Sequence, residues 1–131
     1  MSRIDKITED IIGACIKIYK ELGLGLLESV YEEVLFYELT KKYGYQVARQ
    51  QAIKIAYDGI EKEKAFRADL IVENLVLIDL KSVEEIHRKF KKITLSYIRL
   101  ASLELGLLIN FGEELLTKGI TRLINDYKGT Y

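Results

Sequence analysis

The chain has 131 residues, of which 49% are hydrophobic and 31% charged, and its 20 basic and 20 acidic side chains give a formal net charge of zero. This length predicts one domain spanning residues 1–131, and the balanced charge excludes a global basic field, so any contact with nucleic acid must come from a local patch. A lone cysteine, Cys15, excludes an internal disulfide, and with His87 as the one histidine a Cys/His zinc site within one chain is excluded too. The start of the chain has no apolar signal region and no run approaches a membrane span, which predicts a soluble cytoplasmic protein.

Two helices are expected at the start of the chain. Apolar residues recur at steps of three and four, as in an amphipathic helix, at Ile4, Ile7, Ile11, Cys15, Ile18 and Leu22. Gly23 and Gly25 end this helix, since glycine tolerates a left-handed cap. A second helical pattern runs from about Leu26 to Tyr43 and ends at Gly44.

Strand patterns follow. Ile53, Ile55 and Tyr57 alternate with less apolar residues, and residues 64–81, "KAFRADLIVENLVLIDLK", predict two strands joined by a turn at Glu73-Asn74. The second of these strands, residues 75–81, is nearly all apolar, which predicts a central place in a sheet.

The last third of the chain returns to a helix and then a strand. Helical spacing runs from His87 to about Leu103, and residues 105–111, "LGLLINF", predict a buried strand. Residues 120–126, "ITRLIND", fit a short strand or a helix. The order helix, helix, three strands, helix, strand and a C-terminal tail predicts an α/β (α+β) fold with a mixed sheet and helices packed against it.

Asp79 is unusual because every residue before it in its predicted strand is apolar, and an ionised carboxylate there needs a partner. Lys81 lies two residues further on and therefore on the same face. A local ion pair at a strand end and a functional site both explain this pattern.

Asp69 adds a second carboxylate on the preceding strand. In that strand Phe66, Ala68, Leu70 and Val72 are expected on one face, and Arg67, Asp69 and Ile71 on the other. Neighbouring carboxylates repel unless a cation lies between them, and a divalent metal, Arg67 or Lys81 could supply it. A three-residue connection centred on Asn74, or one bulge, would pair Asp69 with Asp79, whereas a two-residue turn would separate them, and we predict the former.

Glu28 adjoins Leu24, Tyr31 and Leu35 on its helix, at the edge of an apolar surface that faces the body of the protein. It is either an acid near a helix N-terminus that stabilises the helix dipole or a carboxylate held for chemistry.

One dense basic cluster, "HRKFKK", begins the helix after Lys81. Its members Arg88, Lys89, Lys91 and Lys92 either contact a phosphate backbone or form a solvated helix face.

Three blocks of this sequence resemble the GxxExxY family, which is placed in the PD-(D/E)XK nuclease-like superfamily. They are "GLLESVY" with Gly25, Glu28 and Tyr31, then "RADLIVENLVLIDLKS", then "GLLINFG", and the resemblance spans about residues 5–125. The resemblance implies a restriction-endonuclease-like core with a mixed four-stranded sheet flanked by helices.

The resemblance also implies a phosphodiesterase site that uses Mg²⁺ or Mn²⁺ and acts on DNA or RNA. Asp69 and Asp79 would hold the metal, while Lys81 and Glu28 would be the catalytic lysine and the additional helix acid. Gly25, Tyr31, Arg67 and Tyr97 would support the site. Gly25 would let the helix start close to the preceding turn, and Tyr31 would pack or hydrogen-bond beside Glu28.

Two positions depart from that family. Relatives commonly have glutamate at Asp79, and many carry a glutamine four residues before Tyr97, where this chain has Ile93. An inactive descendant that binds nucleic acid or a protein partner is therefore the alternative. A homodimer formed through the first helix is a third expectation.

Overall fold

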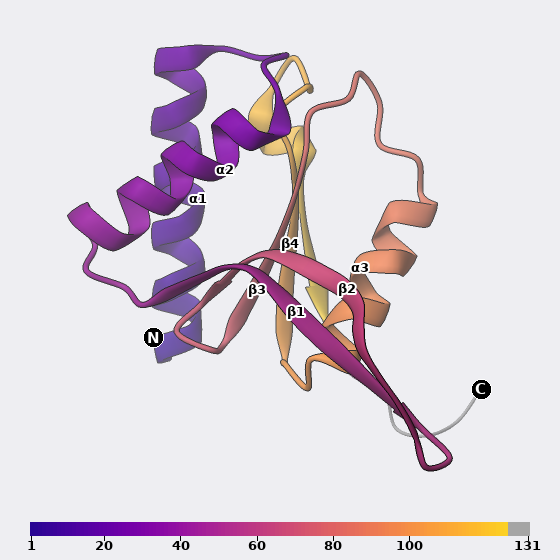
Figure 1. Ribbon diagram of the computed structural model, residues 1–131. Helices are drawn as coiled ribbons and strands as arrows, with labels where there is room; N and C mark the ends of the chain where they lie inside the picture. The colour runs from indigo at the N-terminus through magenta and orange to yellow at the C-terminus, as the bar shows by residue number, and fades with distance from the viewer. Residues whose placement is uncertain (126–131) are drawn as a thin grey trace.

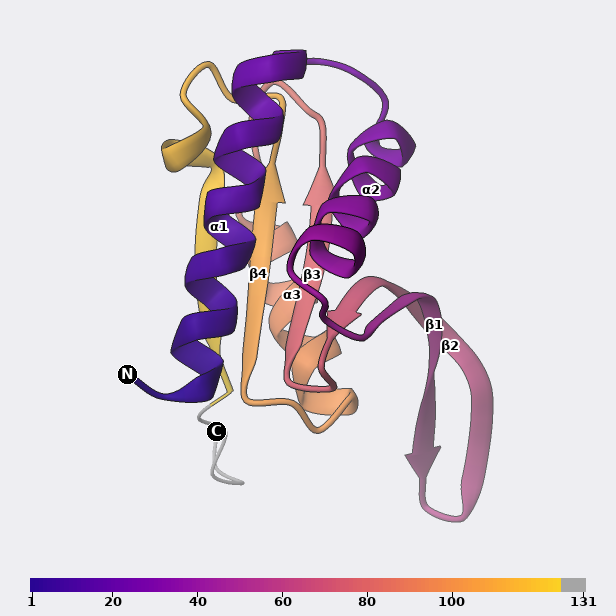
Figure 2. The same ribbon diagram turned by 90° about the vertical axis from the view of Figure 1, so that its left-hand side faces the viewer.

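A five-stranded mixed sheet with helices on both faces forms the centre of the structure. The structure is a computed structural model that describes residues 1–125, except the side chains of residues 63–65. Strand order is β1-β2-β3-β4-β5; β3 and β4 are parallel, and the other neighbours are antiparallel. Helices α1 and α2 cover one face and α3 covers the other (Figures 1 and 2). The elements are α1 (Arg3–Leu22), α2 (Glu28–Tyr37), the π-helical turn η1 (Glu38–Lys42), β1 (Val47–Tyr57), β2 (Ile60–Val72), β3 (Val76–Lys81), α3 (Lys89–Leu100), β4 (Leu105–Asn110), the 3-10 turn η2 (Leu116–Gly119) and β5 (Ile120–Ile124).

This arrangement confirms the predicted fold class, but the sheet has five strands rather than four. Residues 120–124, which fitted either a strand or a helix, add the fifth strand beside β4. The remainder of the expected C-terminal tail, residues 126–131, lies outside the described residues.

Helix α1 has the ends that its sequence predicts. The Ser2 side chain accepts a hydrogen bond from the Asp5 N–H at its start, and Gly23 has a φ of 79° at its end, where its N–H donates to the Tyr19 carbonyl. Both contacts satisfy backbone groups that a helix end leaves free. None of the helices within residues 1–125 is long and apolar enough to cross a membrane.

The two faces of the sheet bury separate cores. The larger core lies under α1 and α2 and includes Tyr31, Leu35 and Phe111, all fully buried. The smaller core lies under α3 and is built around Leu77 and Ile98. All residues of β4, and all of β3 except Lys81, are buried, which explains the nearly continuous apolar sequences of the two strands.

The β2–β3 connection has the predicted odd register. Val72 pairs with Val76 and Leu70 pairs with Ile78, so three residues centred on Asn74 join the strands. Asn74 has a φ of 53°, the left-handed conformation that asparagine tolerates. Continued by one residue, this register brings Asp69 opposite Asp79.

The predicted alternation along β2 is wrong, because the strand changes face at Asp69. Phe66 and Ala68 pack with the α3-side core, whereas Leu70 and Val72 pack under α1 and α2. The β2–β3 ladder ends at Leu70, and beyond it the β1–β2 hairpin leaves the sheet as an arm (Figures 1 and 2). Asp69 therefore lies at the branch point, between the two cores rather than on either face.

Candidate metal and phosphate site

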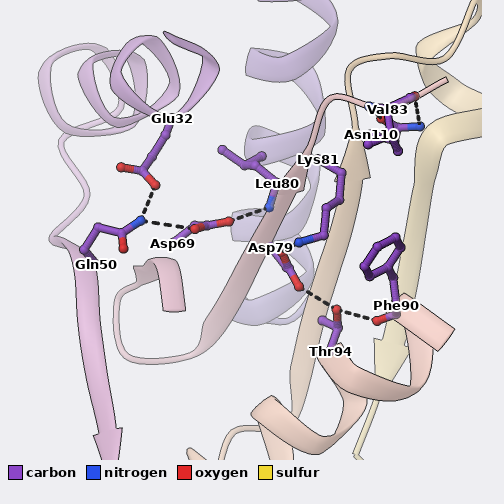
Figure 3. Close-up of polar contacts among 10 residues, drawn as sticks. All are labelled: Glu32, Gln50, Asp69, Asp79, Leu80, Lys81, Val83, Phe90, Thr94 and Asn110. Carbon is purple, nitrogen blue, oxygen red and sulfur yellow. Dashed lines mark hydrogen bonds and ion pairs between the residues drawn. The ribbon is translucent and has the colours of Figure 1, made fainter. Parts of the chain in front are cut away.

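Asp79 and Lys81 form a half-buried ion pair beneath α3. Lys81 Nζ lies 3.1 Å from Asp79 Oδ1, and the two side chains are 23% and 9% exposed, respectively. The other carboxylate oxygen of Asp79 accepts a 2.7 Å hydrogen bond from the hydroxyl of Thr94, which is fully buried (Figure 3). The ammonium of Lys81 also lies 5.1 Å from the centroid of the Phe90 ring, within cation–π range. Both oxygens of Asp79 are thus oriented by α3 and by Lys81.

Asp69 is held by the interrupted sheet. Its Oδ2 accepts a 2.8 Å hydrogen bond from the Leu80 N–H, and its Oδ1 accepts a 3.1 Å bond from the Gln50 side-chain amide. The Asp69 carboxylate thus accepts from the Leu80 N–H in place of a strand partner, because the β2–β3 ladder has ended before this point.

The environment of Asp69 disfavours a negative charge. Burial is the main cause and the charges of Asp79 and Glu32 add to it, so that the pKa of Asp69 rises to about 6 although the two hydrogen bonds lower it. A carboxyl in this state would be stabilised as an anion by a cation nearby.

The three carboxylates that the sequence predicts for the site all act on Lys81, the predicted lysine. Burial lowers the pKa of Lys81, but the charge and hydrogen bond of Asp79, followed by the charges of Glu28 and Asp69, outweigh burial and raise it. All three predicted carboxylates therefore lie close enough to act on this ammonium group.

Glu28 is the first residue of α2 and is exposed, rather than facing the body of the protein as predicted. Glu32, one turn later, is 8% exposed and accepts hydrogen bonds from Arg49 at 2.8 Å and from Gln50 at 2.5 Å. The Gln50 amide donates to both Glu32 and Asp69 and so joins α2 to the branch point of β2 (Figure 3).

Sequence reasoning missed Glu32, Gln50 and Thr94. Thr94 carries a readable signal, since it occupies the buried stripe of α3, four residues before Ile98. Gln50 carries none, because its role depends on a left-handed backbone (φ 53°) within β1. Ile93, where the resemblance led us to expect glutamine, is 36% exposed, and its neighbour Thr94 makes the contact to Asp79.

Two of the expected supporting residues shape the loop before α2. The hydroxyl of Tyr31 donates to the Gly23 carbonyl at 2.7 Å and accepts from the Leu26 N–H at 3.1 Å, and its ring stacks on Phe111. Gly25 has a φ of 85°, and a Cβ there would meet nothing within 4 Å. Conformation, rather than a close approach to the preceding turn, is therefore the reason for glycine at this position.

The other two supporting residues make contacts within or against the β1–β2 hairpin. Arg67 is exposed and donates to the Gln50 carbonyl at 3.2 Å. Tyr97 stacks on Phe66, with ring centroids 3.9 Å apart, and so fixes the base of the hairpin arm against α3.

The basic cluster lies at the start of α3, next to the ion pair. Its side chains are exposed at Arg88, Lys89, Lys91 and Lys92. Lys89 Nζ lies 5.9 Å from the centroid of the Phe90 ring, the same ring that Lys81 approaches. Phe90 thus lies close to both the half-buried ammonium of Lys81 and the exposed ammonium of Lys89.

The donor set fits a metal ion that takes few protein ligands. Among the described residues, no group of three or more His, Cys, Asp or Glu side chains could hold a metal by itself. Two carboxylates on neighbouring strands, one of them with a raised pKa, are a donor set that a divalent cation such as Mg²⁺ could use, because Mg²⁺ commonly takes one or two carboxylates and completes its shell with water and phosphate oxygens.

One family model matches residues 5–123, and it describes the PD-(D/E)XK nuclease superfamily. No curated protein and no solved structure matches the chain. The matched range includes every strand except the last residue of β5, together with all of the carboxylates and the lysine described above. The chain therefore belongs to the PD-(D/E)XK nuclease superfamily.

Proposed function

We propose that this protein hydrolyses phosphodiester bonds of nucleic acid in a reaction that depends on Mg²⁺ or Mn²⁺. The observation that carries the proposal is the half-buried Lys81–Asp79 pair, 3.1 Å between charged atoms, with Asp69 from the neighbouring strand hydrogen-bonded to the Leu80 N–H between them. Membership of a nuclease superfamily supports the same reading.

Asp69 and Asp79 are the proposed metal ligands. When bound, a divalent cation supplies neutralisation of phosphate charge and a bound water with a lowered pKa. The protein contributes orientation: the Leu80 N–H and the Gln50 amide hold Asp69, and Thr94 holds Asp79. Each carboxylate oxygen has one protein donor and keeps lone-pair capacity for a further ligand.

Lys81 is proposed to stabilise negative charge on the reacting phosphate. Its raised pKa keeps it an ammonium at neutral pH, so it donates hydrogen bonds and does not act as a base. Glu28, exposed beside it, would accept a hydrogen bond from water or substrate at the mouth of the site.

The basic residues at the start of α3 are proposed to hold the nucleic-acid backbone. Lysine and arginine neutralise phosphates without regard to base sequence, which suits a protein of zero net charge that needs a local basic surface.

Calorimetric titration with Mg²⁺ and with Mn²⁺ tests the metal site. Wild type and Glu33→Gln, a control in the exposed part of α2, should bind metal, and Asp79→Asn should lose binding. Cleavage of single- and double-stranded DNA and RNA should follow the same order. Lys81→Met, which keeps the apolar stem beside Phe90, should bind metal and lose cleavage.

A second candidate is a non-catalytic nuclease-fold protein that binds nucleic acid or a protein partner. It is favoured by Asp79, whose oxygens are already engaged by Lys81 and Thr94, and by the apolar Ile93 where members of the GxxExxY family often have glutamine. Nucleic-acid binding without metal binding at millimolar Mg²⁺ or Mn²⁺ would establish this second candidate in place of the first.

A further inference from the structure

An open cleft of about 870 Å³ lies at the edge of the sheet where β3 and β4 end, beyond the ion pair. Its lining comes from the loops after β3 and β4 and from the loop between α1 and α2. These loops lie at the same end of the sheet in Figure 1. Its lining consists of Leu24, Gly25, Ser82, Val83, Glu84, Glu85, Gly112, Glu113, Glu114, Leu115 and Lys118.

The topology explains why a cleft forms here. Strands β3 and β4 are parallel, so their carboxyl ends lie at the same edge. The chain leaves β3 for α3 on one face, whereas the loop after β4 lies against α1 on the other, where the Tyr19 hydroxyl contacts the carbonyls of Glu113 and Glu114 at 2.7 and 2.6 Å. Loops that diverge to opposite faces of an α/β sheet leave a crevice that commonly binds a ligand.

The floor of this cleft is rigid. Fully buried Asn110 accepts 3.0 Å hydrogen bonds from the N–H groups of Val83 and Gly112, and its amide donates to the Val83 carbonyl at 2.9 Å. A Cβ on Gly112 would lie 2.1 Å from that carbonyl oxygen. The two loops are therefore held in contact before any partner binds, which lowers the entropic cost of binding.

Exposed leucines lie in the cleft lining and next to it along the chain. Leu24 and Leu115, in its lining, are 51% and 54% exposed. Leu26 and Leu27 follow Gly25 in the same loop and are 40% and 74% exposed, and Leu22, at the end of α1, is 42% exposed. Leu24 and Leu115 thus expose apolar surface within the cleft, as interaction sites commonly do.

The lining is strongly acidic although the whole chain is neutral. Four glutamates against one lysine give the lining a formal charge of −3. No ion pair is found for Glu84, Glu85, Glu113 or Glu114 within residues 1–125. Such a surface repels phosphate and attracts cationic groups, which favours a basic occupant over nucleic acid.

We propose that this cleft binds a segment of a protein partner that carries both basic and large apolar side chains. The leucines would contact the apolar side chains, and the glutamates would pair with lysine or arginine and select against acidic segments. This docking surface does not depend on the nuclease reaction, because its lining includes none of the proposed metal ligands.

Fluorescence anisotropy with a labelled amphipathic peptide of leucine and lysine, about 12 residues long, tests the proposal. The peptide should bind wild type, and binding should weaken as salt rises. Peptides of the same length with serine in place of leucine, or glutamate in place of lysine, should not bind.

Variants of the cleft locate the binding. Leu24→Ser/Leu115→Ser and Glu84→Gln/Glu85→Gln should each weaken the peptide about tenfold or more, as expected when central contacts of an interface are removed. Two controls away from the cleft should bind like wild type: Leu100→Ser, at a leucine of similar exposure (41%) on α3, and Glu104→Gln, at an exposed glutamate. Asp79→Asn should also leave peptide binding unchanged, which separates this result from any failure of the nuclease proposal.

Three outcomes would overturn the proposal. The serine–lysine peptide or spermine could bind as tightly as the leucine–lysine peptide, which would indicate a site for cations alone. The control variants could weaken binding as much as the cleft variants, which would indicate adhesion of the peptide to the surface in general. Light scattering could show self-association that the leucine substitutions abolish, which would make a second copy of the chain the occupant.

Discussion

Asp69 and Asp79 come from neighbouring strands but have different environments. Asp79 is paired with a lysine, whereas Asp69 has only neutral donors and lies near two other carboxylates. Sequence reasoning identified both residues as a pair but could not distinguish them, because the difference depends on where β2 separates from β3. A negative charge on Asp69 should therefore lower the free energy of unfolding.

The cost of the Asp69 charge should depend on pH in a known direction. Its pKa rises from the usual 3.8 to about 6, so the folded protein holds this proton more tightly than the unfolded chain. The cost is absent below pH 4, develops between pH 4 and 6, and is complete above pH 6. Without metal, Asp69→Asn should therefore be more favourable at pH 8 than at pH 4, by about 1–2 kcal/mol after allowance for partial exposure.

Urea unfolding with EDTA at pH 4, 6 and 8 measures this difference between Asp69→Asn and wild type. Asp5→Asn, at an exposed carboxylate in the first turn of α1, is the control and should show a smaller change with pH. A stability difference for Asp69→Asn that is the same at all three pH values would contradict the prediction.

Thr94 tests whether Asp79 needs its buried donor. Thr94→Val keeps the shape of the side chain but removes the hydroxyl, leaving one Asp79 oxygen without its 2.7 Å hydrogen bond. Thr94→Val should lower the free energy of unfolding by about 1–3 kcal/mol, whereas Thr94→Ser, which keeps the hydroxyl, should keep most of the wild-type stability. Chemical denaturation measures this order, and an unchanged stability of Thr94→Val would show that Asp79 does not need this donor.

At the scale of elements, the sequence predicts the three helices and the first four strands because their periodicities and their Gly and Asn positions agree with the structure. The odd β2–β3 register was predictable too, since Asn74 tolerates a positive φ. The change of face at Asp69 was not, because it depends on the left-handed Gln50 opposite it and on the end of the β2–β3 ladder. That local break in a regular pattern is also where the candidate site forms.

A side chain added where the loops after β3 and β4 meet should cost more stability than one added where α3 packs on the sheet. Gly112→Ala would place a Cβ 2.1 Å from a backbone carbonyl, which only a movement of the loop can relieve. Gly106→Ala would meet the Ile98 side chain at 2.6 Å, and that side chain can shift. We expect a cost of about 1–3 kcal/mol for Gly106→Ala and a larger one for Gly112→Ala. Urea unfolding of the two variants decides the order, and a smaller cost for Gly112→Ala would show that the loops separate easily.

At the scale of the whole molecule, a net charge of zero conceals separated charges. The acidic cleft carries −3, so the remainder of the chain carries a matching excess of positive charge, and the exposed residues 88–92 concentrate four basic side chains at the start of α3. Composition could not predict this separation, because it arises from the fold, which brings the loops after β3 and β4 together.

This separation predicts opposite effects of two pairs of substitutions on nucleic-acid binding. Lys89→Gln/Lys92→Gln should weaken binding and reduce the slope of log K against log salt by about 0.9 for each phosphate contact that is lost, if the strand is double-helical DNA. Glu84→Gln/Glu85→Gln should strengthen binding a few-fold at low salt without changing the number of phosphate contacts. The substitution removes a long-range repulsion between the glutamates and the phosphates, and salt screens this repulsion. Lys54→Gln, at an exposed lysine on the hairpin arm, is the matched control. Filter binding of a labelled duplex between about 50 and 200 mM salt, in EDTA so that no cleavage occurs, measures both quantities. If Lys54→Gln reduced the slope of log K against log salt as much as Lys89→Gln/Lys92→Gln does, the nucleic acid would lie along the hairpin arm instead of at α3.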